Sequence, residues 1–133
     1  MSVFKNEMLS QEYVYDFAVD GGLVSLIDLS AKEGYKPLPV GALIQNVYAN
    51  VATAVTSGGS ATVSWGNADV DGYSGTAKAK TALVANAAFT GDGALVPSMI
   101  VADQTFSVNI AVAALTAGKV YFTVEYVVPG RDV

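Results

Sequence analysis

The chain has 133 residues, a net charge of −5 and only 14% charged residues, and it contains neither cysteine nor histidine. The missing side chains exclude disulfides, zinc thiolate sites, cysteine nucleophiles and every catalytic or metal centre that needs histidine. The seven Lys and Arg residues are scattered, with Lys78 and Lys80 as the closest pair, so the sequence argues against nucleic acid as a partner.

The charge density predicted for the surface is low. A single domain of this size exposes roughly 6,600 Å². Nineteen charged residues give about one charge per 350 Å², whereas an average domain carries about one per 200 Å². Hydrophobic residues make up 52% of the chain, so much of the surface must be apolar or weakly polar. This indicates contact surfaces, the alternative being a bland surface of Ala, Ser, Thr and Gly.

The N-terminal region predicts an arm followed by a strand. Residues 1–10 precede the first clear alternation and carry Val3, Phe4, Met8 and Leu9, so we expect an arm that docks on a neighbour, followed by one β domain over residues 11–133. No apolar h-region occurs near the start, and no apolar run has the roughly 18 residues of a membrane span. The expectation is therefore a cytoplasmic product that can leave the cell by some other route, without a membrane partner.

The next segments read as strands separated by glycine and proline turns. Residues 11–19 alternate and 23–29 follow, with an Asp20-Gly21-Gly22 hairpin signal between them. The expected apolar faces carry Tyr13, Tyr15, Phe17 and Val19 in the first strand, and Leu23, Ile27 and Leu29 in the second. The stretch 31–41 contains Pro37 and Pro39 and is expected to be a loop.

The middle of the chain predicts a central strand, a shorter strand and a helix. Residues 42–56 are a long run rich in β-branched residues, apolar on both faces at its start. The turn Ser57-Gly58-Gly59-Ser60 leads into a strand over 61–66. Within 67–98 the aspartates and glycines indicate loops, and the alanine-rich stretch 77–88 predicts a short helix.

The last third shows the clearest alternation. Residues 105–113 and 120–128 predict a C-terminal hairpin around a turn at 116–119. The residues expected to be most buried are Phe106, Val108, Ile110, Phe122, Val124 and Tyr126. Short strands without a βαβ rhythm favour an all-β fold: an antiparallel β-sandwich, jelly-roll-like, with one short helix.

Paired carboxylates are the one catalytic arrangement that the composition leaves open, as in glycosidases. The candidate pairs are Asp69 with Asp71, Asp16 with Asp28, and Glu12 with Glu125. The sequence Asp69-Val70-Asp71-Gly72 is more typical of a turn than of a Ca²⁺ site, because no bidentate glutamate follows. Asp16 and Asp28 are expected in solvent. We therefore predict no catalytic, cofactor-binding or metal residues and no cofactor.

The tyrosines leave a carbohydrate-binding alternative open, because aromatic rings stack on sugar faces. Most of them fall inside strand patterns, where packing explains them: Tyr13, Tyr15, Tyr121 and Tyr126. Only Tyr35 and Tyr73 lie in predicted loops. A sugar site would need these two side chains to be exposed and adjacent.

Several segments together resemble a known class of phage protein. They are 38–44, 47–51, Gly58–Gly66, Asp71-Gly72-Tyr73 and Ala117–Tyr126. Their order resembles small β-rich proteins encoded beside the major capsid protein of tailed bacteriophages, of the head decoration, cement or head-fibre-base type. The resemblance spans residues 38–126 except the alanine-rich segment, and it transfers no site residues. It implies a homo-oligomer, commonly a trimer, seated on the capsid exterior.

Three classes of function follow from these observations. The first, which we favour, is a non-enzymatic virion protein that decorates or cements a capsid by oligomerising on the major capsid protein lattice. Freedom from cysteine and a low-charge surface suit that role. The second is a phage tail or fibre protein or a cell-surface carbohydrate-binding module. The third is a carboxylate hydrolase, which needs two acidic side chains facing each other across a cleft.

Overall fold

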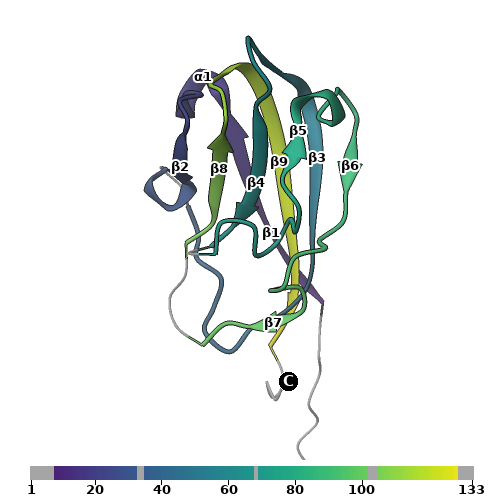
Figure 1. Ribbon diagram of the computed structural model, residues 1–133. Coiled ribbons are helices and arrows are strands. Elements are labelled where there is room, and N and C mark those ends of the chain that lie inside the picture. The colour runs from purple at the N-terminus through teal and green to yellow at the C-terminus, as the bar shows by residue number, and fades with distance from the viewer. Residues whose placement is uncertain (1–7, 33–34, 68, 102–104, 129–133) are drawn as a thin grey trace, which may run out of the picture.

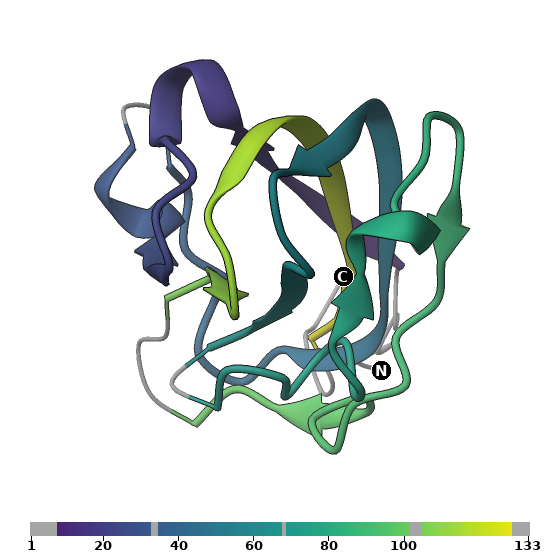
Figure 2. The same cartoon turned by 45° about the horizontal axis from the view of Figure 1, so that its top comes forward.

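Two antiparallel sheets packed face to face form the body of the protein (Figure 1, Figure 2). The structure is a computed structural model that describes residues 8–32, 35–67, 69–101 and 105–128. The five-stranded sheet has the order β1-β9-β3-β6, with β7 also pairing with β3, and the four-stranded sheet has the order β2-β8-β4-β5. The expected all-β sandwich is confirmed.

The elements have the following bounds. The five-stranded sheet contains β1 (Leu9–Asp16), β3 (Leu43–Ser57), β6 (Ala88–Phe89), β7 (Ser98–Met99) and β9 (Leu115–Val127). The four-stranded sheet contains β2 (Ser25–Asp28), β4 (Thr62–Gly66), β5 (Lys78–Ala79) and β8 (Ser107–Ala111). The helical elements are α1 (Phe17–Asp20) and the 3-10 turns η1 (Leu29–Ala31) and η2 (Lys80–Ala82). None of these described helices is long and apolar enough to cross a membrane.

The strand order is that of a jelly roll. Strands β6 and β7 pair with different stretches of β3 and share one edge position. If β6 and β7 are counted as one strand, the fold has eight strands, which can be numbered one to eight along the chain. The two sheets then have the orders 1-8-3-6 and 2-7-4-5, which is the jelly-roll arrangement of two Greek keys. Strand β1 begins and β9 ends at the end where β7 lies, called the lower end here, and α1 lies at the opposite, upper end (Figure 1).

Both predicted hairpins are wrong, because the chain changes sheet at each of these turns. Strand β1 pairs with β9, whereas β2 pairs with β8 in the other sheet. The glycines at 21–22 serve this crossing: a Cβ on Gly22 would lie 2.6 Å from the carbonyl oxygen of Leu115, whose N–H donates to the Gly22 carbonyl. Likewise β8 and β9 belong to different sheets, and the expected turn at 116–119 lies inside β9.

Other expectations hold in part. Strand β3 is central and 15 residues long, as predicted. The short helix exists, but it is α1 and not the alanine-rich stretch 77–88, which holds only η2 between the two-residue strands β5 and β6. Alanine favours helix only weakly, and backbone bonds of this stretch to β3 outweigh it, including Val55 N–H to the Leu83 carbonyl. Most of the expected arm, residues 1–7, lies outside the described residues, and β1 begins at Leu9.

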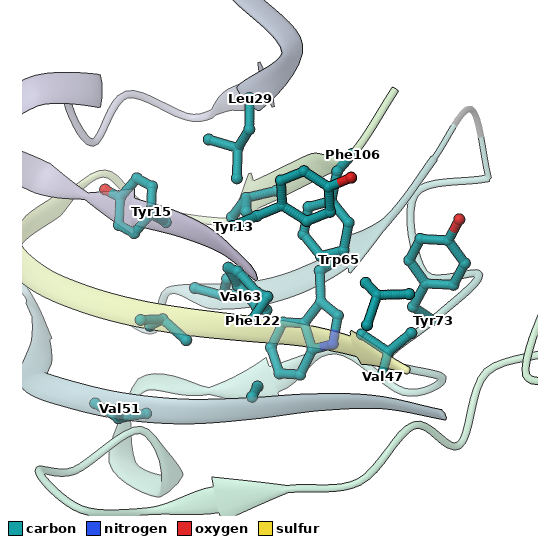
Figure 3. Close-up of a cluster of buried hydrophobic side chains, with 14 of the residues drawn as sticks. Tyr13, Tyr15, Leu29, Val47, Val51, Val63, Trp65, Tyr73, Phe106 and Phe122 are labelled. Atoms are coloured by element: carbon teal, nitrogen blue, oxygen red, sulfur yellow. The ribbon is translucent and has the colours of Figure 1, made fainter. Parts of the chain in front are cut away.

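An aromatic column fills the core between the sheets (Figure 3). Phe106 is its centre: its ring stacks on Tyr13 at 4.8 Å and on Tyr73 at 5.6 Å, and lies 5.0 Å from Phe122. Trp65 continues the column, 5.2 Å from Phe122. Five of the six residues predicted to be most buried are buried, and Tyr126 is half-buried. The alternation therefore identified the core faces even where it assigned the wrong strand partner.

Candidate functional site

Two of the candidate carboxylates are helix caps rather than catalytic groups. Asp16 accepts a hydrogen bond of 3.0 Å from the Ala18 N–H and begins α1. Asp28 accepts one of 2.8 Å from the Ser30 N–H and begins η1. Each oxygen satisfies an N–H that the first helical turn leaves unpaired. The two aspartates lie in different sheets, so the structure does not bring them together as a pair.

Asp69 and Asp71 lie in the turn after β4. The Asp69 carbonyl accepts from the Gly72 N–H at 3.0 Å, and the Asp69 N–H donates to the Asn67 side chain at 2.9 Å. The carboxyls are exposed, and a hydrogen bond shared with Asp71 raises the pKa of Asp69. Within the described part of the chain no three acidic residues gather as a metal site. The turn interpretation therefore explains this pair.

Glu12 and Glu125 come closer to each other but do not face across a cleft. Glu12 pairs with Thr123 and Glu125 with Ser10, so the two glutamates are diagonal neighbours on β1 and β9. Both point from the outer face of the five-stranded sheet, opposite the buried Tyr13 and Val124. The Tyr48 hydroxyl bonds to Glu125, which raises the pKa of Tyr48. An open sheet face cannot enclose a glycosidic bond between two carboxyls.

The loop tyrosines do not form a sugar platform. Tyr73 is 1% exposed, and Tyr35 is half-buried with its ring stacked on Tyr13 at 5.2 Å. Burial raises the pKa of Tyr73 to about 12. The Tyr13 hydroxyl donates to the Lys36 carbonyl at 2.8 Å, which satisfies a buried polar tip. The exposed, adjacent pair that the carbohydrate alternative required is absent from these positions.

An open hollow lies beside the upper end of β3. It has a volume of about 250 Å³ and is lined by Val55, Thr56, Ser57, Lys80 and Thr81. The Lys80 ammonium already donates to the Ser57 carbonyl at 2.8 Å. The lining contains no carboxylate, so the hollow offers no acid–base pair.

The outer face of the five-stranded sheet is broad and sparsely charged. Strand β3 has no charged residue in its 15 positions. Val14 on β1 pairs with Tyr121 on β9, and Tyr121 pairs with Asn50 on β3. These three residues form an uncharged row across the three strands. Among the described residues of these strands, the charged side chains are the two glutamates, Asp16 and Lys119, the last two paired at 4.0 Å. Such a charge-poor surface has the composition of an interface centre.

An apolar row crosses the lower end of this face. Leu43 pairs with Val127 on one side and with Met99 on the other. Met8 precedes Leu9, the partner of Tyr126, and so lies level with Val127. We call Met8, Leu43, Met99 and Val127 the lower apolar row. Met8 is 53% and Met99 49% exposed. Exposed methionines, which have flexible unbranched side chains, are typical of adaptable contact surfaces.

A second apolar surface lies at the upper end of β2. We call Leu23, Val24, Leu26 and Val112 the upper edge patch, all between 48% and 76% exposed. Ser25 pairs with Ile110, so Leu23 and Val24 lie level with the end of β8, next to Val112. Val112 has a φ of +74°, unusual for a β-branched residue. Neither apolar surface was located from the sequence, although the low charge content predicted that such surfaces exist.

Comparisons with solved structures show where this fold recurs. Chains of similar fold occur in the cyanophage Pam1 capsid asymmetric unit (TM-score 0.69, 18% identity, 96% of this chain and 89% of that chain) and in the acid-stable capsid of Helicobacter pylori bacteriophage KHP30 (TM-score 0.64, 15% identity, 100% and 97%). A third occurs in the capsid of Ralstonia phage GP4 (TM-score 0.62, 13% identity, 94% and 86%). No protein family and no curated protein matches the sequence. At these identities the likeness establishes a shared fold over the whole chain.

Proposed function

We propose that this protein is a non-enzymatic structural component of a bacteriophage capsid, and that it decorates or cements the exterior of the head. In this role it oligomerises with itself, as a trimer, on the lattice of the major capsid protein. It is made in the host cytoplasm and ends on the virion.

One observation carries the proposal: the fold likeness to chains of three phage capsids covers 94–100% of this chain and 86–97% of theirs. A jelly roll by itself hosts many functions. Here, however, whole chains correspond, and all three structures are described as capsids. The resemblance in the order of sequence segments points the same way.

The surface supports an assembly role on physical grounds. The accessible surface is 6735 Å², which with nineteen charged residues gives about one charge per 350 Å². Two contacts of about 800 Å² per partner would cover roughly a quarter of it. The lower apolar row is our candidate for the contact with the major capsid protein, because its two exposed methionines, Met8 and Met99, lie beside a charge-poor face. Burying that row at a junction stabilises the shell by mass action.

The test is co-sedimentation with shells assembled from the major capsid protein of the phage that encodes this chain, together with light scattering of the protein alone. We expect saturable binding. Met99→Lys should weaken it by at least about tenfold, which is about 1.4 kcal/mol, because a charge would be buried without a partner. Val84→Lys is the matched control, since Val84 is 52% exposed but lies outside the row.

Two results bear differently on the proposal. A protein that is monomeric at micromolar concentration still fits if it binds shells, because neighbouring seats raise its effective concentration. A monomer that also fails to bind any shell would defeat the proposal. If Met99→Lys and Val84→Lys bind shells equally well, the proposed capsid role is unaffected, but the lower apolar row is not the contact with the major capsid protein.

A further inference from the structure

The free edge of β2 is the least protected part of the four-stranded sheet. Edge strands are usually shielded by short length, by charged side chains (above all lysine), by proline, by bulges or by a covering element. Strand β2, of sequence Ser-Leu-Ile-Asp, is short and ends in one acid, but it has no lysine, proline or bulge, and its register with β8 is regular. Three of its four residues are exposed, including Leu26 at 48%.

The ladder shows which backbone groups point away from β8. Leu29 donates its N–H to the Phe106 carbonyl at 2.9 Å, and the register places Asp28 opposite Ser107. In an antiparallel pair, hydrogen-bonded and non-bonded positions alternate. The groups of Ile27 and Ser25 therefore face β8, and those of Leu26 and Asp28 face the free edge. Among the described residues, no other main-chain group bonds to this edge.

Side chains beside the edge extend it into an apolar surface. Val24 and Leu26 alternate on the outer side of the strand, and Leu23 and Val112 continue the patch at the upper end. With about 60–120 Å² for a buried aliphatic side chain, these four present roughly 250 Å². Two copies would bury about 500 Å² of apolar side chain in addition to the paired backbone. This area is small for a specific interface, so the contact is weak by itself and its specificity comes from the paired backbone.

We infer that β2 pairs antiparallel with β2 of a second copy of this chain, across a two-fold axis at Leu26. This deepens the proposed homo-oligomer and rests on it. An isologous contact needs one self-complementary patch, and an antiparallel strand meets that condition by pairing residue 24 with residue 28 of the other copy. On a shell, such a contact joins copies that belong to neighbouring oligomers.

The charges of the patch permit this pairing. The upper edge patch contains no lysine or arginine, and Asp28 is the single acid of the strand. In the inferred register the two Asp28 residues lie about 13 Å apart along the strands. Each carboxylate already accepts the Ser30 N–H, so neither needs a partner from the other copy. A strongly basic partner would find little to bind here, which favours a second copy.

The absence of cysteine makes the test direct, because one substitution introduces the only thiol. At a hydrogen-bonded antiparallel position the two Cα atoms lie about 5.5 Å apart, within the range for a disulfide. Under mild oxidation of the purified protein alone, Leu26→Cys should form covalent dimers about tenfold faster than Val84→Cys, a control of similar exposure. Adding Val24→Lys to Leu26→Cys should remove the advantage.

The cysteine assay separates this inference from the proposed function, because it uses the purified protein without shells. Equal rates for the two cysteine variants would overturn the β2 pairing, whatever the shells show. If Leu26→Cys does not dimerise while Leu26→Lys weakens shell binding, the edge binds the capsid protein and the second copy is wrong. If the protein binds zwitterionic lipid vesicles and Leu26→Asp abolishes that binding, the occupant is a lipid surface, which also overturns the inference.

Discussion

Tyr73 illustrates how far a single side chain can depart from its sequence context. Glycines and aspartates surround it, so its neighbours predict a loop, and its backbone is indeed in a turn. Its N–H, however, donates to the Trp65 carbonyl at 3.1 Å, which folds the turn back over β4. The ring then stacks on Phe106 inside the core. Local composition describes the backbone here, and long-range packing decides the burial.

The buried tyrosines predict a loss of stability in alkali. Burial raises the pKa of Tyr73 and of Tyr15 to about 12, above the ordinary value of about 10. Between about pH 10 and 12 the unfolded chain loses these protons while the folded chain keeps them, so the free energy of unfolding falls as pH rises. Below pH 10 both states are protonated, and this contribution is constant.

Tyr73→Phe isolates one part of that loss. The variant gives up the hydroxyl's bond to the Asn67 side chain, which costs about 1 kcal/mol at neutral pH. From pH 9 to 12 the wild type should lose about 2–3 kcal/mol more than the variant, since two pKa units correspond to about 2.7 kcal/mol. Urea denaturation at several pH values measures this. Parallel curves for the two proteins would show that Tyr73 does not titrate as inferred.

At the scale of elements, β9 explains the wrong hairpin. Thr116-Ala117-Gly118-Lys119 has turn composition, yet β9 continues through it against β3 with repeated register shifts. Gly118 has a φ of +148°, and a Cβ there would lie 2.9 Å from Val55 Cγ2. Such irregularities bend a strand and increase its twist. Gly118 therefore indicates an irregularity within strand β9 and not a turn that ends the strand.

Gly118→Ala should destabilise the fold by about 2–3 kcal/mol, from the unfavourable φ and the contact with Val55. The expected fall in Tm is roughly 5–15 °C. Gly58→Ala is the matched control, because a Cβ there meets nothing within 4 Å, and it should stay within about 0.5 kcal/mol. Thermal unfolding followed by circular dichroism gives both values; similar Tm values for the two variants would contradict the role of Gly118.

The elements also show what sequence could predict. Alternation with period two reports which residues share a face, so it located β1 to β4, β8 and β9 and most of their buried positions. It failed beside the first turn: residues 17–20 form α1, and Val19 and Leu23, expected on apolar faces, are 71% and 76% exposed. It contains no information on the strand that lies alongside. In a jelly roll, consecutive strands often belong to opposite sheets, so the usual preference for hairpins between neighbours fails. The two-residue strands β5, β6 and β7 are too short to show any period.

At the scale of the whole molecule, composition predicted the kind of surface but not its place. Few charges for the expected area implied contact surfaces. The structure shows a charge-poor outer face on the five-stranded sheet with apolar groups at its lower end, and a separate apolar patch at the upper edge of the four-stranded sheet. The lower apolar row combines Met8, which precedes β1, with residues of β3, β7 and β9, which are distant in sequence. Only the sheet order brings them level, so no linear pattern could have identified the row.

The N-terminal segment provides the last test of assembly at this scale. Strand β1 starts at Leu9, so removing residues 2–7 leaves its pairing with β9 intact, and the variant should keep the wild-type Tm within a few degrees. The removed stretch includes Val3 and Phe4, which are costly to leave in water, and we predict that it docks on a neighbouring chain. Shell binding should therefore weaken by at least about tenfold, or about 1.4 kcal/mol. Removal of residues 129–133 is the control for chain shortening. Unchanged oligomeric mass and unchanged shell binding after the N-terminal deletion would show that the segment makes no such contact.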